Sequence, residues 1–407
     1  MIADNLRNPH TIRERCANIT AAIDQGESTH FRIRRERLDD AAALVAQVTR
    51  RRYPDGHIPY HSRWRHFEAG GVDRSAELDE RLAAIFGSPS AVETARARID
   101  LTVVSVLLDA GAGDRWCYHD SRSRQDYARS EGLGVASFRA FMAGAFSSRS
   151  EEPCRVDGIA LQKIDANALA HVFQAHGDNP LIGLEHRARL LNRLGETMLR
   201  DAARFGPDAR PGEIFFRLTD KGRRTELGAA DLLHSLLVGL GDIWLTSSQL
   251  DGSALGDTWR HRFAAGSGPD QGWVPFHKLT QWLTYSLLEP FERAGVTIQS
   301  MDDLTALPEY RNGGLLIDTG VLELIDPALA DRLLEPGHEA IIEWRALTVT
   351  LLDELAPLVR ARLDLSAQAM PLARVLEGGT WAAGRELAAR LRNGRPPLRI
   401  DSDGTIF

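Results

Sequence analysis

A histidine and a lysine stand together at the expected start of a helix. A leucine repeat predicts that helix over residues 275–293, which puts His277 and Lys278 in its first turn. Lysine is unfavourable there because the helix dipole favours anions at this end. Backbone N–H groups together with an ammonium group can instead bind a phosphate or a carboxylate. A solvated lysine near a helix start is the commoner interpretation of this pattern alone.

A carboxylate occupies a similar position in residues 307–314, LPEYRNGG. Pro308 suits the first helical position, so we expect Glu309 in the first turn, where the helix dipole keeps a carboxylate ionised. An ionised carboxylate can stabilise a developing cation or activate water. Arg311 follows closely and could orient an anionic substrate. A glutamate that merely complements the dipole and a surface arginine are the commoner interpretations.

Other polar and aromatic residues stand where a helical scaffold does not need them. Arg345 lies beside Trp344 in a long amphipathic helix, residues 341–358, where its burial requires a carboxylate or a ligand as partner. Loop residues complete the set, although a tryptophan more often packs into a core. These are Asp257, Trp259 and Trp116.

Motifs of several enzyme classes are missing from the sequence. It has no GxxxxGK[ST], no GxGxxG opening a helix, no GxSxG and no HExxH, which weighs against P-loop NTPases, Rossmann enzymes, α/β-hydrolases and zincins. The densest histidine group is His57, His61 and His66. We interpret these as polar loop histidines, because further ligands of suitable softness do not lie near them in sequence. We therefore expect no metal and no cofactor.

Composition limits the class of protein. The chain has 407 residues, is 43% hydrophobic and 26% charged, and carries a formal net charge of −7. This excludes a disordered chain and a basic nucleic-acid-binding surface. No apolar run approaches the roughly 20 residues of a membrane span. Cys16, Cys117 and Cys154 are far apart, and no apolar signal segment is present, so we expect a cytoplasmic protein.

Helical periodicity dominates the chain, so we expect a mainly α, bundle-like enzyme with a few short strands. Helices are expected at residues 39–51, 89–110, 131–146, 183–205, 229–244, 275–293, 341–358 and 380–391. Strands are expected at residues 214–218, 296–298 and 398–400, the last in a C-terminal hairpin with 405–407. We divide the chain into an N-terminal helical region, residues 1–110, and a helical catalytic region, residues 111–407, which could form one continuous domain.

Several long segments resemble a family linked to uracil catabolism, in the ring-opening pathway of fungi and bacteria. The resemblance covers nearly the whole chain. It rests on RSEGLGVASFRAFMAGAFS (129–147), DNPLIGLEHRARLLNRLGE (178–196), VPFHKLTQWLTYSLLEP (274–290), LPEYRNGGLLIDTGVL (307–322), EWRALTVTLLDELAPLVR (343–360), LEGGTWAAGRE (376–386) and the tail RIDSDGTIF (399–407).

A more distant similarity, in order and spacing over roughly residues 100–360, is to queuosine-salvage proteins, which are N-glycosidases acting on a nucleoside 5′-phosphate. The PEYR of residues 308–311 resembles their Ala-Asp-Tyr-Arg, which is taken to carry the catalytic carboxylate. FHK at 276–278 resembles their Phe-Tyr-Lys, and EWR at 343–345 resembles Glu-Ile-Arg. Glutamate here replaces aspartate, and histidine replaces tyrosine. The resemblance implies a fold related to helix-hairpin-helix DNA glycosylases.

The two resemblances imply hydrolysis of the C1′–N bond in a ribosyl 5-phosphate. The implied substrate is a ribosylurea phosphate, a small molecule that would yield urea and ribose 5-phosphate. Glu309 is expected to face C1′, with basic groups on the phosphate, as remote binding energy orients the sugar. The expected site residues are the catalytic Glu309, Tyr310 and Asp257 and the substrate-binding Lys278, His277, Arg311, Arg345, Trp116 and Trp259.

Two other functions stay open. One is an amide-cleaving hydrolase that acts on an opened pyrimidine ring and leaves the sugar bonded to nitrogen. The other is a non-catalytic accessory protein that carries a labile intermediate between enzymes of the pathway. The sequence does not indicate an oligomeric state.

Overall fold

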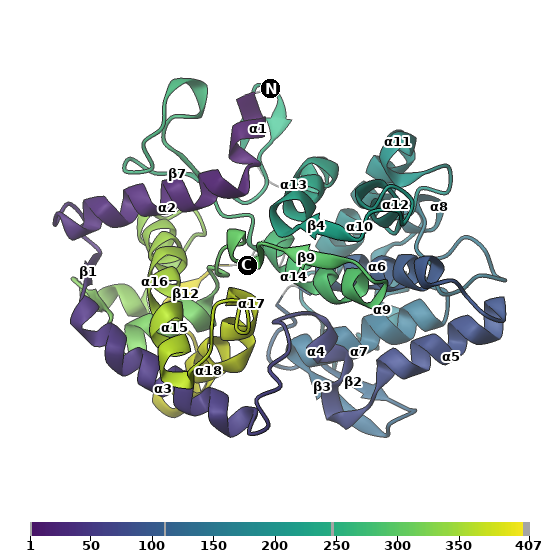
Figure 1. Cartoon of the computed structure of the whole chain (residues 1–407), viewed down its shortest axis with the longest axis horizontal. Helices are drawn as coiled ribbons and strands as arrows, with labels where there is room; N and C mark the ends of the chain where they lie inside the picture. The colour runs from purple at the N-terminus through teal and green to yellow at the C-terminus, as the bar shows by residue number, and fades with distance from the viewer. Residues whose placement is uncertain (1, 110, 246–247, 402–407) are drawn as a thin grey trace. The chain divides into compact units, whose positions relative to one another are not determined.

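A computed structural model describes residues 2–109, 111–245 and 248–401 (Figure 1). The chain divides into two compact units, and each is built from separated stretches of sequence. Among the described residues, the first unit comprises residues 2–61, 248–281 and 300–401, and the second comprises residues 62–109, 111–245 and 282–299. Neither unit follows the boundary that we expected near residue 110. Most described residues are helical, which confirms the mainly α class.

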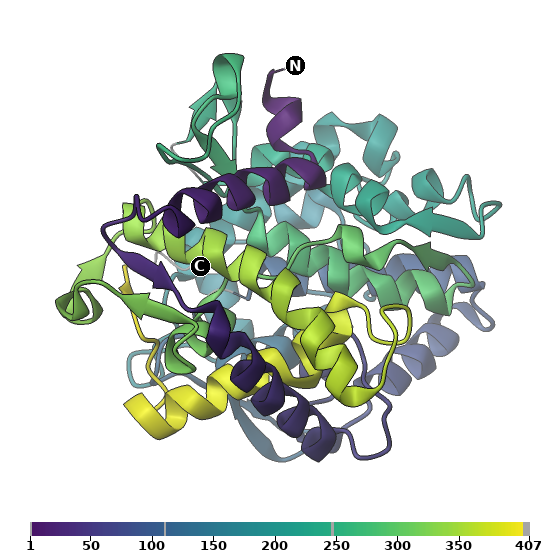
Figure 2. The same cartoon turned by 60° about the vertical axis from the view of Figure 1, so that its left-hand side comes forward.

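The core of the first unit forms around one long helix. Helix α16 (Glu339–Leu363) packs against α2 (Pro9–Asp24) and α3 (Leu38–Arg52), so the start of the chain covers a helix from near its end (Figures 1 and 2). Helix α15 (Tyr310–Asp318) packs against α18 (Trp381–Arg392). The buried residues of α16 run from Ala340 to Val359, which agrees with the apolar stripe expected over residues 341–358.

Short strands join the loops of the first unit. Strands β1 (Phe31–Ile33) and β10 (Leu322–Leu324) are antiparallel, as are β7 (Thr258–Arg260) and β8 (Trp273–Pro275). The remaining elements of this unit are α1 (Ile2–Leu6), η1 (Arg35–Arg37), β5 (Gln249–Leu250), β6 (Ser253–Ala254), η4 (Gly268–Asp270), η5 (Met301–Asp303), η6 (Pro327–Asp331), β11 (Leu333–Leu334), α17 (Leu372–Val375), the π-helical turn η7 (Leu376–Thr380) and β12 (Arg399–Ile400).

The expected C-terminal hairpin is not the pairing that β12 makes. Strand β12 is parallel to β11, with Leu333 opposite Arg399 and Leu334 opposite Ile400. The other half of the expected hairpin, residues 405–407, lies outside the described residues. The partner of β12 that the structure describes therefore comes from a distant segment of the chain, which a local turn signal does not indicate.

The second unit is also helical. Its α6 (Ala91–Leu107) packs against α7 (Arg129–Met142), and α10 (Leu184–Arg200) packs against α8 (Gly158–Leu161). The other elements are α4 (Trp64–Phe67), η2 (Ala69–Gly71), α5 (Arg74–Phe86), β2 (Cys117–Asp120), β3 (Gln125–Ala128), α9 (Ala166–Val172), α11 (Ala202–Phe205), α12 (Glu213–Leu218), β4 (Glu226–Gly228), α13 (Ala229–Gly239), η3 (Gly241–Ile243) and β9 (Thr297–Gln299). Helix α14 (Lys278–Arg293) begins in the first unit and continues into the second.

The strand expected at residues 214–218 is wrong, because these residues form α12. Ile214 and Phe215 are both buried, whereas a half-buried strand would bury alternate residues. The strand expected at 296–298 is confirmed as β9, which runs parallel to β4. In α6 the N-cap is Ser90, whose hydroxyl accepts the N–H of Glu93, so the helix starts two residues later than expected.

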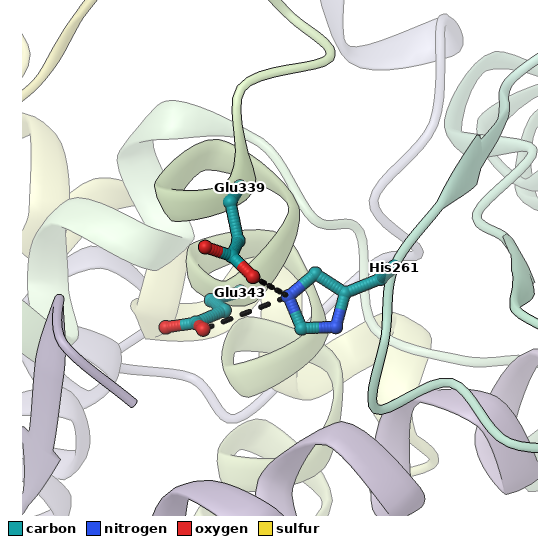
Figure 3. A group of neighbouring side chains, drawn as sticks. All are labelled: His261, Glu339 and Glu343. Atoms are coloured by element: carbon teal, nitrogen blue, oxygen red, sulfur yellow. Dashed lines mark ion pairs between the residues drawn. The ribbon is translucent and has the colours of Figure 1, made fainter. Parts of the chain in front are cut away.

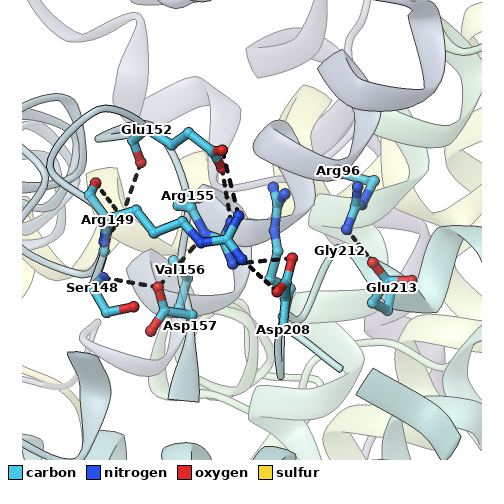
Figure 4. Close-up of polar contacts among 12 residues, drawn as sticks. Arg96, Ser148, Arg149, Glu152, Arg155, Val156, Asp157, Asp208, Gly212 and Glu213 are labelled. Carbon is cyan, nitrogen blue, oxygen red and sulfur yellow. Dashed lines mark hydrogen bonds and ion pairs between the residues drawn. The ribbon is translucent and has the colours of Figure 1, made fainter. Parts of the chain in front are cut away.

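Ion pairs tie the loops of the second unit together (Figure 4). The guanidinium of Arg155 lies 2.8 Å from Glu152, 3.5 Å from Asp157 and 3.6 Å from Asp208, and Arg149 also contacts Asp208 at 2.6 Å. Because Arg155 is almost fully buried, these carboxylates compensate a charge that would otherwise be costly. The two arginines are thus paired with carboxylates of the same cluster, and the contacts join the 149–157 segment to Asp208.

The structure bears on the expectations about membrane spans and about the cysteines. None of the described helices has both the length and the apolar character needed to cross a bilayer. Cys16, Cys117 and Cys154 form no disulfide, and Cys16 and Cys154 are buried.

Candidate active site

A buried ion pair forms the base of the candidate site in the first unit. Nη1 and Nη2 of Arg345, on α16, lie 2.7 and 2.6 Å from Oδ1 and Oδ2 of Asp257, which precedes β7. The guanidinium also lies over the Phe276 ring, 4.1 Å from its centroid. Burial alone would raise the pKa of Asp257, but Arg345 outweighs burial and the net pKa is lowered.

The same ion pair holds the starts of two helices. Oδ2 of Asp257 accepts the backbone N–H of Lys278 at 3.0 Å, so it caps α14. The backbone carbonyl of Asp257 accepts the N–H groups of Phe276 at 2.9 Å and His277 at 3.2 Å. Nε of Arg345 donates to the carbonyl of Pro308 at 3.3 Å, directly before Glu309. Arg345 and Asp257, expected as a substrate-binding and a catalytic residue, are thus buried and bonded to each other and to the two helix starts.

Glu309 is the N-cap of α15 rather than a residue of its first turn. Its Oε2 accepts the N–H of Arg311 and its Oε1 accepts the N–H of Asn312, both at 2.6 Å. Pro308 stands before the cap, so it is not the first helical residue. Burial raises the pKa of Glu309, while the two N–H groups and the nearby charges of Lys278 and His61 oppose the rise in part. The helix start thus still favours the ionised carboxylate through these two N–H groups, although Glu309 occupies the N-cap rather than the first turn.

Lys278 is the first residue of α14 and is half-buried. Its charge acts on Glu309, so the structure brings together the two ionisable residues that the sequence placed at helix starts. The chain has only three lysines, at positions 163, 221 and 278, although arginine is common. The rarity of lysine in this chain, together with the position of Lys278 at a helix start that disfavours cations, could therefore have singled out this residue from the sequence.

His61 contacts Glu377, and its charge acts on Glu309; neither His61 nor Glu377 was among the expected site residues. Nδ1 of His61 lies 2.8 Å from Oε2 of Glu377, and Oε1 of Glu377 accepts hydrogen bonds from Tyr53 at 2.9 Å and Arg52 at 3.0 Å. Burial alone would raise the pKa of Glu377, but His61, Arg52 and Tyr53 outweigh burial and lower it. His61 is thus an oriented histidine rather than a loop histidine in solvent.

The turn that carries Glu377 is π-helical, and its glycines allow close packing on α3. A Cβ at Gly379 would lie 2.6 Å from the carbonyl oxygen of Val45 and 2.7 Å from Oγ1 of Thr49. Such wide turns often occur at functional sites because they re-aim a side chain. Here the segment LEGGT lets η7 approach α3, which brings Glu377 to Arg52 at the end of that helix.

Two of the expected residues have structural partners. Nε2 of the buried His277 lies 2.8 Å from the carbonyl of Leu6, and burial lowers the pKa of its imidazole. Its φ of +47° lies in the left-handed region, so the chain turns sharply into α14. Nε1 of Trp259 donates to Oδ1 of Asp257 at 2.8 Å. The imidazole of His277 is thus bonded to the chain before α2, and the indole of Trp259 is bonded to the ion pair.

The remaining expected residues differ in their surroundings. Tyr310 is 39% exposed, and the guanidinium of Arg311 lies 4.7 Å from its ring centroid. Arg311 is buried, with Nη1 donating to the carbonyl of Gly394 at 3.1 Å. Trp116 belongs to the second unit, where it is buried and donates from Nε1 to the carbonyl of Phe173 at 2.9 Å. We therefore assign no substrate contact to Arg311 or Trp116.

The chain is similar to other proteins over nearly its whole length. The family model described as "Protein of unknown function (DUF1688)" matches residues 5–407. The chain is 37% identical over 430 residues to Uracil catabolism protein 4 of Lachancea kluyveri, which covers 98% of this chain and 97% of that protein. It is 40% identical over 379 residues to Protein urg3 of Schizosaccharomyces pombe, which covers 91% of this chain and 90% of that protein.

Proposed function

Because the chain belongs to the family of Uracil catabolism protein 4, which the DUF1688 model matches, we propose that it acts in uracil catabolism as an N-glycosidase. The proposed reaction is hydrolysis of the C1′–N bond of a ribosylurea 5-phosphate. Water adds to C1′, the C1′–N bond breaks, and the products are urea and ribose 5-phosphate. The sugar carries the phosphate through the reaction unchanged.

The observation that carries the proposal is the anchored carboxylate of Glu309. Two backbone N–H groups fix its oxygens, which leaves lone pairs of both oxygens to act on a substrate. A carboxylate held in this way needs no reorganisation when positive charge develops at C1′. Its raised pKa makes it a better base than an exposed glutamate, so it also suits removal of a proton from the attacking water.

Lys278 is the proposed contact to the substrate phosphate. A point charge on a flexible stem suits a phosphate, and Lys278 is half-buried and close enough for its charge to act on Glu309. Arg345 does not share this role in the proposal, since Asp257 neutralises it in a bidentate pair. The net charge of the chain is −7, so attraction of the phosphorylated substrate depends on local charge within about one Debye length, roughly 8 Å.

His61 is the proposed proton donor to the departing nitrogen. Glu377 holds Nδ1, which leaves Nε2 as the ring atom that can carry a proton to a substrate. The proton that His61 gives to urea is balanced by the proton that Glu309 takes from water. Glu377 is a positioning residue in this scheme, because it acts through the imidazole.

The test is a product assay with the purified full chain and synthetic ribosylurea 5-phosphate, followed by NMR of the anomeric carbon and of urea. We expect the anomeric signal of the N-riboside to be replaced by that of ribose 5-phosphate, with one urea formed for each. Ammonia or a carboxylate formed with the C1′–N bond intact would indicate an amide-cleaving hydrolase. Binding without turnover would indicate an accessory protein, and either result contradicts the proposal.

A further inference from the structure

Three ionisable side chains converge in the first unit, in a cluster separate from the Glu309 group. His261 directly follows β7, while Glu339 and Glu343 stand one turn apart on α16 (Figure 3). Nε2 of His261 lies 3.7 Å from Oε1 of Glu339 and 3.5 Å from Oε1 of Glu343. One potential ligand atom from each residue lies within 4.8 Å of the other two.

Two of the converging atoms are buried without a hydrogen bond. The side chain of His261 is 1% exposed and that of Glu343 is 0% exposed. Within the described ranges, which omit residues 110, 246–247 and the chain ends, neither Nε2 of His261 nor Oε1 of Glu343 has a hydrogen-bond partner. A buried polar atom without a hydrogen-bond partner is unfavourable because it has lost its contact with water. Two such atoms facing the same point require a further explanation.

We propose that His261, Glu339 and Glu343 bind a divalent transition-metal cation, with zinc as the best match. The separations of 3.5 and 3.7 Å exceed the 2.7–3.2 Å of a hydrogen bond. Ligand atoms about 2.1 Å from a tetrahedral ion lie about 3.4 Å from one another. One imidazole and two carboxylates suit zinc, whereas magnesium and calcium prefer oxygen ligands only.

Neighbouring residues orient the two carboxylates. The N–H of Phe263 donates to Nδ1 of His261 at 3.2 Å, so cation binding at Nε2 requires the ring proton to move to Nδ1 and this contact to open. Oγ of Ser28 donates to Oε2 of Glu343 at 2.5 Å, and a ring nitrogen of His30 lies 3.3 Å from Oε2 of Glu339. Each carboxylate thus has one oxygen held by a neighbour and turns its other oxygen towards His261, an outer-shell arrangement typical of metal ligands. Nε of Arg262 lies 3.0 Å from Oε1 of Glu339, so this half-exposed arginine shares that oxygen.

The proposed ion also has an open side. His261 and Glu339 line a surface hollow together with Arg260, Arg262, Gly272 and Gly337. Water from this hollow can supply a fourth ligand. The ion would join α16 to the segment after β7, and the Asp257–Arg345 pair joins the same helix to the residue before β7. The proposed role is therefore structural, and it does not depend on the proposed reaction.

The test measures metal content of the full chain, purified without chelator and with any affinity tag removed. After incubation with zinc and gel filtration, mass spectrometry of the metal should give about one zinc for each chain. Glu343→Gln and Glu339→Gln should each retain at least about tenfold less zinc. Glu335→Gln, which changes an exposed carboxylate on the same segment, is the matched control and should bind as the wild type does.

Circular dichroism of each variant establishes that it is folded. If Glu343→Gln fails to fold, the partly exposed Glu339 makes Glu339→Gln the deciding variant. Cobalt replaces zinc in a second measurement, in which visible absorption should appear for the wild type and be lost in Glu339→Gln. The proposal is overturned if the wild type retains less than about one zinc in ten chains, or if all variants retain zinc equally.

Discussion

Asp257 and Arg345 meet in a bidentate ion pair with contacts of 2.7 and 2.6 Å, and both side chains are buried. Arg345 also donates to the carbonyl before Glu309, and Asp257 accepts the N–H of Lys278. One ion pair therefore contacts the backbone at the starts of both helices that carry Glu309 and Lys278. Its effect on a reaction would be indirect, through the two helix starts.

Breaking this pair should destabilise the protein strongly. Asp257→Asn leaves the Arg345 charge buried without a counter-charge, for which we expect a loss of about 3–5 kcal/mol in the free energy of unfolding. Urea denaturation measures this loss. The control is Asp40→Asn, which removes an exposed partner of Arg37 and should cost at most about 1 kcal/mol. Equal losses in the two variants would show that the buried pair is not a structural anchor.

Glu309→Gln should reduce turnover far more than it reduces stability. The side-chain shape remains, but the negative charge facing C1′ is lost, so we expect kcat to fall at least about 100-fold, or roughly 3 kcal/mol. The matched control is Asp165→Asn, which alters another N-cap carboxylate, bonded to the N–H of Ala168 at 2.7 Å. Each variant should lose about 1 kcal/mol of stability. Near-normal turnover by Glu309→Gln would remove this residue from the mechanism.

The pH dependence of kcat/KM should report the raised pKa of Glu309. Its folded-state pKa lies above the ordinary 4.5 because the group is buried, and the proposed base must be ionised. Activity should therefore rise with pH along an acid limb centred above 4.5. Ionisation of Glu309 also costs stability, so its contribution to folding is present at pH below the ordinary value and is lost as pH rises through the folded value. An acid limb at or below 4.5 contradicts the assignment.

Local patterns predicted most of the longer helices, although α2 and α5 were missed, because the apolar period of a helix is set by neighbouring residues. The leucine repeats of α14 and α16 and the stripe of α6 are of this kind. The strand expected in α12 failed because a short apolar run has no distinguishing period. The pairing of β11 with β12 joins distant segments, and turn residues carry no information about such a partner.

The sequence pattern predicted only those residues of the candidate site that lie at the start of a helix. Lys278 and Glu309 were found in this way, although the N-cap position of Glu309 was not. The contact of His61 with Glu377 joins residues 316 positions apart, so no spacing rule reaches it. The same limit applies to His261, whose proposed partners on α16 form a common i, i+4 pair that is usually solvated.

Lys278 should distinguish phosphorylated from unphosphorylated substrate. In Lys278→Ala, we expect KM for ribosylurea 5-phosphate to rise about 10- to 100-fold, because a charged hydrogen bond is lost. KM for ribosylurea without the phosphate should stay nearly unchanged. Lys163→Ala, at an exposed lysine, is the control and should alter neither value. Equal effects on both substrates would show that Lys278 does not contact the phosphate.

His61 should matter only when the leaving group needs a proton. In His61→Asn, we expect hydrolysis of ribosylurea 5-phosphate to slow by about 10²- to 10⁴-fold, which is typical of losing a general acid. A ribosyl pyridinium 5-phosphate releases neutral pyridine without protonation, so the same variant should hydrolyse it at a nearly normal rate. Glu309→Gln should slow both substrates, because both develop positive charge at C1′.

Glu377→Gln should show the same substrate dependence as His61→Asn, but with a smaller loss, since Glu377 only positions the imidazole. His57→Asn changes an exposed histidine of the same segment and should leave both rates unchanged. Initial rates with the two substrates, measured for each variant at one pH, give the comparison. If His61→Asn slows the pyridinium substrate as much as the urea substrate, His61 is not the proton donor, and its contact with Glu377 serves only to hold η7 against the 53–61 segment.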